Sequence, residues 1–334
     1  MKTKNILVIR LSAMGDVAMC VPIVAQLAQR GDVRVTVLTR KAFLPLFAQL
    51  NDVETFAFSK DLSVLRLFRE LRKGQKWDTV IDLHNVLRTK FLRFLFRLSG
   101  VKIAVLQKNR CQKRKLTRKH CKKMRQLPSV QDEYVAACAR AGFPVGAKIF
   151  SPIFSERAKD FSPLPDDILK ITGEKNIGIA PFAKHRTKVY PLDKILQVIE
   201  HFSEKGVHIF LFGGKSDAET LENWAAIHNN VYSLAGKTDF TGELQMMAHL
   251  DCMLSMDSGN MHLANLVGVP VLSVWGATHP FAGFVSAGKN TIVQRNLDCR
   301  PCSIFGNKPC WKGTYECMDI PPQKIIEEIE KIIT

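Results

Sequence analysis

An aspartate directly after the first apolar run of the chain is a candidate general base. Residues 6–10 (ILVIR) form a β-rich run, and the following SAMGD puts Asp16 beside Gly15, where a helical pattern begins. Ligands of open α/β sheets bind at the carboxyl ends of the strands, so we expect Asp16 to face a ligand crevice. The positive end of the helix dipole favours the charged carboxylate, which is the form that accepts a proton. An ordinary first-turn helix acid is the other interpretation.

Two later segments have the composition of phosphate-binding loops. Residues 181–191 (PFAKHRTKVYP) concentrate Lys, His and Arg, and Lys188 among them could neutralise a leaving diphosphate. In residues 211–219 (LFGGKSDAE), Gly213 permits close backbone approach, and a helix N-terminus follows. Glu219 could accept hydrogen bonds from a ribose or a base. The alternatives are a solvated basic loop and an ordinary helix acid.

The most specific pattern is SMDSGNMHLANLVGVPVLSVWG, which spans residues 255–276. Asp257, Ser258 and Gly259 end a predicted strand, and the backbone amides after them open a helix. Such a turn offers N–H donors and a hydroxyl to a phosphate. His262 lies one turn into the helix, where it could contact a phosphate or sugar. A packed structural histidine is the other interpretation.

Four of the nine cysteines lie within twenty residues of one another near the C-terminus. Their spacing, Cys299-x2-Cys302-x7-Cys310-x6-Cys317, could provide four thiolates for a structural zinc ion. The spacing differs from the usual pair of C-x-x-C knuckles, so structural thiols without metal are the alternative. The odd number of cysteines argues for reduced thiols rather than a disulfide framework.

The formal charge of +17 comes almost entirely from one segment. Residues 83–131 contain 15 Lys and Arg and no Asp or Glu. A segment of this kind favours an anionic partner, which could be a membrane, an acidic glycolipid or a nucleic acid, and a solvated basic loop is the alternative. Residues 107–128 lack the interleaved aromatics that stack on bases, so we expect no nucleic acid. The candidate residues for binding such a partner are Ser12, Arg110, Lys113, Arg114, Arg118 and His120.

The elements that must position these residues form two series of alternating strands and helices. The proline-containing residues 151–165 show little periodicity and read as a linker. We therefore predict an α/β protein with a Rossmann-like domain at residues 1–160 and another at residues 161–320, their parallel sheets facing a central crevice. Residues 321–334 form an amphipathic helix that could pack back on the N-terminal domain. The chain lacks an apolar stretch long enough for a membrane span or a signal peptide, so we expect a cytoplasmic protein.

Together the four ordered motifs resemble those of glycosyltransferase family 9, the ADP-heptose:lipopolysaccharide heptosyltransferases. RLSAMGDVAMCVP is similar to the opening signature of the family, and the other three segments follow in the family's order as far as residue 276. The resemblance implies the GT-B architecture and transfer of a heptose from an ADP-sugar to a lipopolysaccharide inner-core acceptor. It also implies inversion at the anomeric carbon and no required cofactor or metal.

The resemblance also implies roles for single residues. Asp16 would be the catalytic base, Lys188 would contact the donor phosphates, and Glu219 the nucleoside. Asp257, with the turn and histidine that follow it, would bind the diphosphate and the sugar. The basic residues 108–125 would form a mobile loop of the acceptor-side domain. This loop would bind an anionic glycolipid at the inner face of the inner membrane.

The chain departs from the family at two positions of the basic loop. Phe182 stands where a glycine is common, and Val189 and Tyr190 precede the proline where many members have a tryptophan. Both changes could alter donor or acceptor fit. The alternatives are therefore a GT-B transferase or epimerase that uses another nucleotide sugar, and a non-catalytic glycan-binding protein.

Overall fold

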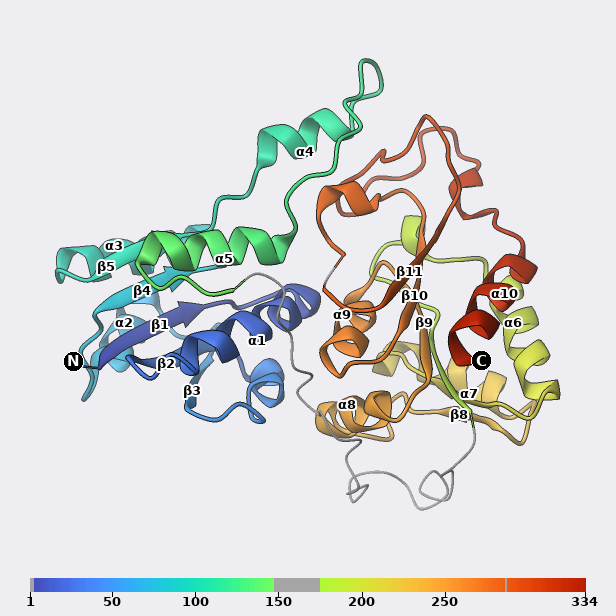
Figure 1. Cartoon of the computed structure of the whole chain (residues 1–334), viewed down its shortest axis with the longest axis horizontal. Coiled ribbons are helices and arrows are strands. Elements are labelled where there is room, and N and C mark those ends of the chain that lie inside the picture. Colours follow the sequence, from blue (N-terminus) through green and yellow to red (C-terminus); the bar gives the residue numbers. More distant parts are fainter. Residues whose placement is uncertain (1–2, 147–174, 286) are drawn as a thin grey trace. The chain divides into compact units, whose positions relative to one another are not determined.

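The computed structural model describes residues 3–146, 175–285 and 287–334 (Figure 1). Internal contacts divide the chain into two compact units. The first contains Met1–Asn109 and Pro128–Ser151, and the second contains Arg110–Leu127 and Pro152–Thr334. The predicted linker at residues 151–165 and the domain boundary at residue 160 lie outside the described residues.

The first unit is built on a five-stranded parallel sheet with the strand order β3-β2-β1-β4-β5. Its strands are β1 (Lys4–Ile9), β2 (Val33–Arg40), β3 (Val53–Phe58), β4 (Thr79–Asp82) and β5 (Lys102–Val105). Its helices are α1 (Met14–Ala28), α2 (Val64–Arg72), α3 (Leu87–Leu98) and α5 (Val130–Ala141). The central strand β1 is fully buried and apolar from Ile6 to Ile9, as expected for a sheet covered by helices on both faces.

The second unit contains a six-stranded parallel sheet with the order β11-β10-β9-β6-β7-β8. Its strands are β6 (Asn176–Ala180), β7 (His208–Leu211), β8 (Val231–Ser233), β9 (Cys252–Met256), β10 (Val271–Trp275) and β11 (Asn290–Gln294). Its helices are α4 (Arg110–Leu116), α6 (Leu192–Glu204), α7 (Ala218–Ala225), α8 (Phe240–Ala248), α9 (Gly259–Leu266) and α10 (Pro322–Ile333). Two parallel α/β sheets were predicted from the sequence, and the structure confirms them.

The C-terminal helix α10 packs within the second unit. Ile325, Ile326 and Ile329 are buried in the same hydrophobic cluster as the strands of the second sheet, and α10 lies against α6. The apolar face of α10 is therefore used in the second unit. The sequence suggested instead that this helix could pack back on the N-terminal domain.

The basic segment also differs from its prediction. Residues 110–127 belong to the second unit, where Leu116 and Leu127 are buried against Ala282. The amide of Leu127 donates to the carbonyl of Phe281. The segment was expected to be a mobile loop of the N-terminal domain. Apolar side chains spaced among its lysines and arginines instead attach it to the second unit.

No helix among the described residues is long and apolar enough to cross a membrane.

Candidate active site

The carboxylate of Asp16 is held by one of its two oxygens. Asp16 lies in the first turn of α1, and its Oδ2 accepts a hydrogen bond from the Ala13 amide at 3.2 Å. The same oxygen is 2.6 Å from Nη2 of Arg10. Within the described part of the chain, Oδ1 has no hydrogen-bond partner, and the side chain retains 26% of its exposure. The arrangement orients the carboxylate and leaves one oxygen for a hydroxyl group.

Arg10 connects Asp16 to the neighbouring strand. Its side chain is only 6% exposed, and Nη1 donates to the carbonyl of Leu83, which follows β4. The guanidinium lies 5.7 Å from the centre of the Tyr134 ring, and the Tyr134 hydroxyl donates to the carbonyl of Asp16. Sequence analysis missed Arg10 as a functional residue. Its position at the carboxyl end of a buried strand, just before the Asp16 loop, was the available signal.

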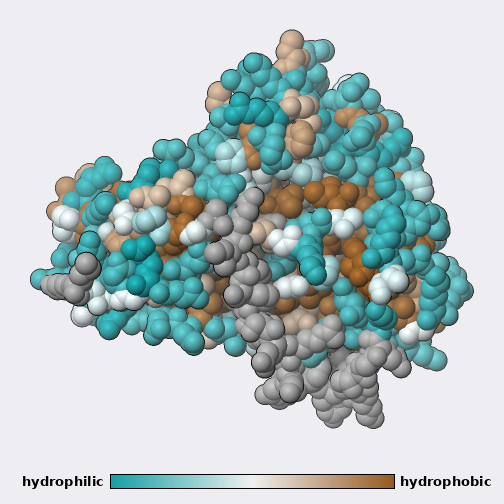
Figure 2. Space-filling model, in the orientation of Figure 1, coloured by the Kyte–Doolittle hydropathy of each residue, from teal (hydrophilic) through white to brown (hydrophobic). Residues whose placement is uncertain are grey.

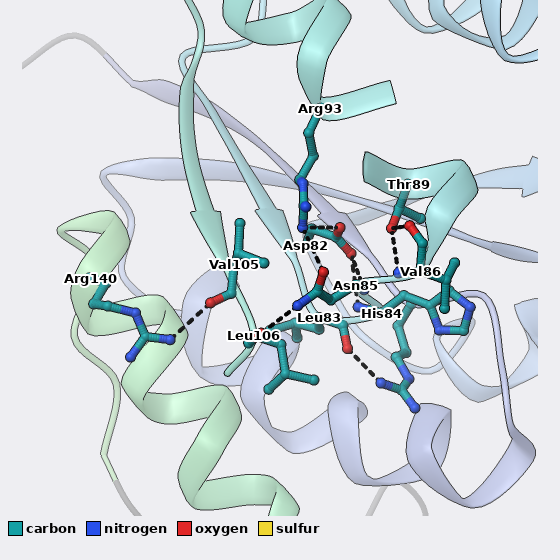
Figure 3. A network of polar contacts seen from close by, with 11 residues as sticks. Asp82, Leu83, His84, Asn85, Val86, Thr89, Arg93, Val105, Leu106 and Arg140 are labelled. Atoms are coloured by element: carbon teal, nitrogen blue, oxygen red, sulfur yellow. Dashed lines mark hydrogen bonds and ion pairs between the residues drawn. The ribbon is translucent and has the colours of Figure 1, made fainter. Parts of the chain in front are cut away.

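The loop after β4 is fixed by a buried carboxylate (Figure 3). Asp82 has no exposed surface, and its Oδ1 accepts hydrogen bonds from the amides of His84 and Asn85 at 2.9 and 2.8 Å. Its Oδ2 pairs with Arg93 of α3 at 2.8 Å. The Asn85 side chain donates to the carbonyl of Leu106 after β5. This network sets the loop backbone rigidly beside the end of β1.

His84 carries a neutral imidazole at this edge of the sheet. Burial, and next the positive charge of Arg10, lower the pKa of His84 to about 4, although Asp82 raises it. Its Nδ1 is buried and has no hydrogen-bond partner among the described residues. The sequence analysis did not select His84, although it follows directly on a buried strand. A neutral imidazole here can exchange hydrogen bonds with a sugar hydroxyl.

The candidate acceptor residues are divided between the two units. Ser12 is half-buried in the loop that precedes α1, in the same unit as Asp16. The other candidates, Arg110, Lys113, Arg114, Arg118 and His120, all belong to the second unit. Lys113 there lies over the ring of Phe284 at 4.9 Å. These five residues therefore do not belong to the N-terminal unit in which they were expected, and their acceptor-binding role stays a prediction.

Two predicted donor-binding residues form a buried ion pair in the second unit. Nζ of Lys188 is 2.7 Å from Oδ2 of Asp257 and donates to the Asp257 carbonyl at 3.1 Å. The two side chains are 14% and 6% exposed. The pair brings the basic loop to the carboxyl end of β9, and thus joins two motifs that are far apart in the sequence.

The backbone at Gly306 packs closely against the Lys188 side chain. Gly306 has φ +73°, and a Cβ added there would lie 2.8 Å from the Cγ and Cε atoms of Lys188. The Thr187 hydroxyl donates to the Gly306 carbonyl, and the Thr187 carbonyl accepts from the Ala277 amide. A Cβ on Gly276 would lie 2.5 Å from that Thr187 carbonyl. Two glycines thus allow the approach that positions Lys188.

The turn after β9 presents the N-terminus of α9, as predicted. Ser258 is the N-cap, and Gly259 is the first residue of the helix. The Ser258 hydroxyl lies 3.2 Å from the hydroxyl of Ser255. His262 is 7% exposed, so its side chain is buried rather than open to solvent. The N-terminal amides of α9 lie beside Asp257, where an anion would be stabilised.

The glycine turn after β7 is also closely packed. A Cβ on Gly213 would meet Leu221 of α7 at 2.6 Å, which explains the glycine at this position. Glu219 is exposed in the first turn of α7. Phe182, one of the departures from the family pattern, stacks on Trp224 of α7 with 6.2 Å between ring centres. Tyr190, the other, is fully buried and donates to the Ile320 carbonyl at 2.6 Å.

The four C-terminal cysteines line one small cavity beside Thr187. Burial raises the pKa of Cys317 to about 11, which keeps that thiol protonated. At Cys310, burial raises the pKa but backbone N–H groups, that of Tyr315 first, lower it below the ordinary value. Among residues 3–146, 175–285 and 287–334, no group of three or more Cys, His, Asp or Glu is arranged to hold a metal ion. The described side chains therefore do not form the zinc site that Cys299, Cys302, Cys310 and Cys317 suggested.

Comparison with known proteins identifies the family. The sequence model of glycosyltransferase family 9 (heptosyltransferase) matches residues 64–308. A lipooligosaccharide heptosyltransferase 2 of Haemophilus ducreyi is 25% identical over 98% of this chain and 99% of its own length. The fold matches the ADP-heptose LPS heptosyltransferase II of E. coli, with a TM-score of 0.70 and 18% identity over 100% of this chain and 98% of that one.

A second solved structure, the E. coli heptosyltransferase WaaC with ADP, has a TM-score of 0.69 and 17% identity over 98% of this chain and 99% of that one. These likenesses confirm the predicted GT-B-like fold with two parallel α/β sheets. The family match covers most of the chain, including the three predicted donor-side motifs at residues 181–191, 211–219 and 255–276. The chain therefore belongs to glycosyltransferase family 9, the heptosyltransferases, and is a glycosyltransferase.

Proposed function

We propose that this protein transfers a heptose from ADP-heptose to an inner-core acceptor of lipopolysaccharide or lipooligosaccharide. The donor is supported by solved relatives described as binding ADP and as ADP-heptose transferases. The acceptor is supported by the lipooligosaccharide enzyme that aligns over nearly the whole chain. We further propose that the reaction is a single inverting displacement that needs no metal ion.

Asp16 is the residue on which this proposal depends most. Arg10 and the Ala13 amide hold Oδ2, so Oδ1 is oriented and open to an acceptor hydroxyl. Oδ1 takes the hydroxyl proton while the acceptor oxygen bonds to C1 of the heptose. The bond from C1 to the diphosphate oxygen breaks at the same time, and its electron pair leaves with ADP. One displacement of this kind inverts the anomeric carbon, unlike a two-step covalent route.

Lys188 and the N-terminus of α9 stabilise the leaving diphosphate in this proposal. Lys188 is already buried and oriented by Asp257, so little reorganisation is needed when a phosphate replaces part of that contact. The nucleoside of the donor is contacted by Glu219 and Gly213. The diphosphate and the sugar are contacted by the segment after β9, through Asp257, Ser258, Gly259 and His262. In the first unit, His84 and Ser12 line the acceptor side. The lipid-linked acceptor would bring the protein to a membrane surface.

The test compares the protein with Asp16→Asn, using ADP-heptose and a purified inner-core acceptor. We expect the substitution to lower kcat by at least about a hundredfold, since positioned proton transfer contributes that much or more. ADP binding, measured by calorimetry, should stay within twofold. A wild-type-like rate for Asp16→Asn would remove the aspartate from the mechanism.

The finer parts of the proposal have separate tests. The anomeric configuration of the product, read by NMR, should be opposite to that of the donor, and excess EDTA should leave the rate unchanged. Selective use of a UDP- or GDP-sugar would replace the heptose assignment. An altered free sugar nucleotide without a glycosidic product would favour the epimerase alternative.

A further inference from the structure

Helix α3 carries a stripe of large apolar side chains exposed to solvent. Leu87, Phe91, Phe94 and Leu98 are 83%, 47%, 55% and 71% exposed. Their spacing of four, three and four residues puts them within an arc of about 60° at about 100° per residue. The rings of Phe91 and Phe94 stack with 6.5 Å between centres. This set, which we term the α3 stripe, is a continuous apolar surface, unlike the singly scattered exposed residues of ordinary proteins.

The α3 stripe is not the face by which the helix packs on its own unit. Thr89, Leu92 and Phe96 are buried on the opposite side, where Phe96 meets Phe68 of α2 edge-on at 5.0 Å. The core of the first unit thus holds α3 without using the stripe. In Figure 2, brown and tan side chains stand among teal ones at the end of the molecule where Figure 1 labels α3. A helix that is apolar on two opposite faces is expected to contact a second apolar partner in addition to its own core.

The charged residues of α3 itself are all basic. Lys90 and Arg97 are exposed along one flank of α3, and the helix contains no acidic residue. The neighbouring helix α2 adds the exposed Arg66 and Arg69, and its Leu65 is 49% exposed. The acid of α2, Glu70, is paired with Lys73. Long basic side chains around an apolar stripe are typical of helices that lie in a membrane interface. The apolar groups there enter the acyl boundary while the cations contact anionic headgroups.

We propose that the α3 stripe docks the protein on the surface of a bilayer that contains anionic lipid. The charge of the flanks argues for this occupant over a second copy of the chain, because two such surfaces would bring Lys and Arg against Lys and Arg. The inference deepens the proposed function, since a lipid-linked acceptor lies in such a surface. The proposal assigns the apolar contact with the bilayer to α3. The basic residues 108–125 do not supply such a contact.

Binding to vesicles tests the proposal without any turnover. The wild-type protein should float with phosphatidylglycerol-containing vesicles and much less with pure phosphatidylcholine. The double variant Phe91→Ser/Phe94→Ser should bind at least tenfold more weakly. The matched control is Ile227→Ser, because Ile227 is 64% exposed but lies in the second unit, and its binding should equal that of the wild type. Equal binding by wild type, double variant and control would overturn the proposal.

Two further measurements distinguish insertion from other contacts. In Phe94→Trp, fluorescence emission should shift to the blue on anionic vesicles, and an unshifted spectrum in the bound state would contradict insertion. Lys90→Gln/Arg97→Gln should bind more weakly and with less salt dependence. If the wild type fails to bind vesicles but forms a dimer that Phe91→Ser/Phe94→Ser dissociates in light scattering, the stripe is a self-association surface and the proposal is wrong.

The outcome is separable from that of the proposed function. ADP affinity and transfer to a detergent-free, deacylated acceptor involve Asp16 and Lys188, and Phe91→Ser/Phe94→Ser should preserve both. Loss of vesicle binding with intact ADP affinity supports the docking surface even if the sugar or acceptor assignment fails. Loss of ADP affinity in the double variant would indicate a folding defect. In that case Phe94→Trp, which keeps the side chain large and apolar, decides the question.

Discussion

Lys188 and Asp257 neutralise each other in a buried ion pair, with 2.7 Å between Nζ and Oδ2. Sequence analysis selected both residues for the donor phosphates, but it did not pair them. The pairing means that each charge is oriented before any ligand binds. It also means that removing one partner leaves the other charge buried and uncompensated, which costs far more than the loss of an exposed contact.

Lys188→Met should therefore lower both ADP affinity and stability. We expect at least a tenfold rise in the Kd for ADP and a loss of roughly 3 kcal/mol in the free energy of unfolding. Calorimetry and denaturant unfolding measure the two quantities. Lys184→Met is the control, since Lys184 is an exposed lysine of the same loop. In the double variant Lys188→Met/Asp257→Asn, the free energy of unfolding should recover while ADP affinity stays low. A double variant no more stable than Lys188→Met would contradict a buried ion pair.

Gly306→Ala should displace the Lys188 side chain. Gly306 has φ +73°, and its added Cβ would meet Lys188 carbons at 2.8 Å. Gly313 has φ +74° with nothing within 4 Å, so Gly313→Ala has the same backbone strain without the clash. Both variants should lose about 1 kcal/mol of stability from the left-handed backbone. Only Gly306→Ala should weaken ADP binding, by at least threefold in calorimetry, and equal ADP affinities would show that the Lys188 position tolerates the shift.

The local sequence was enough to predict most of the fold and the helix N-terminus that follows β9. The β-rich runs and the helical patterns between them predicted two parallel α/β sheets, because period and turn residues are local signals. The turn at Asp257, Ser258 and Gly259 was predicted because a few residues are enough to show a helix N-terminus after a buried strand. Such features depend little on what the rest of the chain does.

Contacts between distant segments were not predictable in this way. The carbonyl of Leu83 accepts from Arg10, 73 residues away, and only the adjacency of β1 and β4 brings them together. The basic residues 110–127 were assigned by charge, whereas Leu116 and Leu127 decide where they pack. Charge patterns predict what a surface attracts, but buried apolar contacts determine which unit carries that surface.

Arg10→Met tests whether the orientation of Asp16 matters for its proposed role. The methionine keeps an unbranched apolar side chain but removes the guanidinium, and with it the 2.6 Å contact to Asp16, the bond to Leu83 and the contact with the Tyr134 ring. We expect kcat to fall by roughly ten- to a hundredfold, since misplacement of a catalytic group by 1 Å has effects of that size. ADP affinity, which depends on the second unit, should not change. Tyr134→Phe, which removes only a hydroxyl bonded to the Asp16 backbone, should reduce kcat much less.

We expect Glu243 to make the stability of the protein depend on pH, independently of sugar transfer. It lies in α8, where burial first and the nearby Asp239 second raise its pKa to about 7. The folded state therefore binds a proton that the unfolded chain releases near its ordinary value. The free energy of unfolding should fall as pH rises from the unfolded pKa of about 4.3 to about 7.

Glu243→Gln stays neutral at every pH, so it should remove this part of the pH dependence. Relative to the variant, the wild type should lose about 1 to 3 kcal/mol between pH 5 and pH 8, because each unit of pKa difference is worth about 1.4 kcal/mol. Denaturant unfolding at the two pH values measures the difference. Glu222→Gln is the control, because Glu222 forms a half-exposed ion pair with Lys237 and should show no such trend. Parallel pH profiles for wild type and Glu243→Gln would mean that the carboxyl is ionised in the folded protein, and that α8 tolerates its charge.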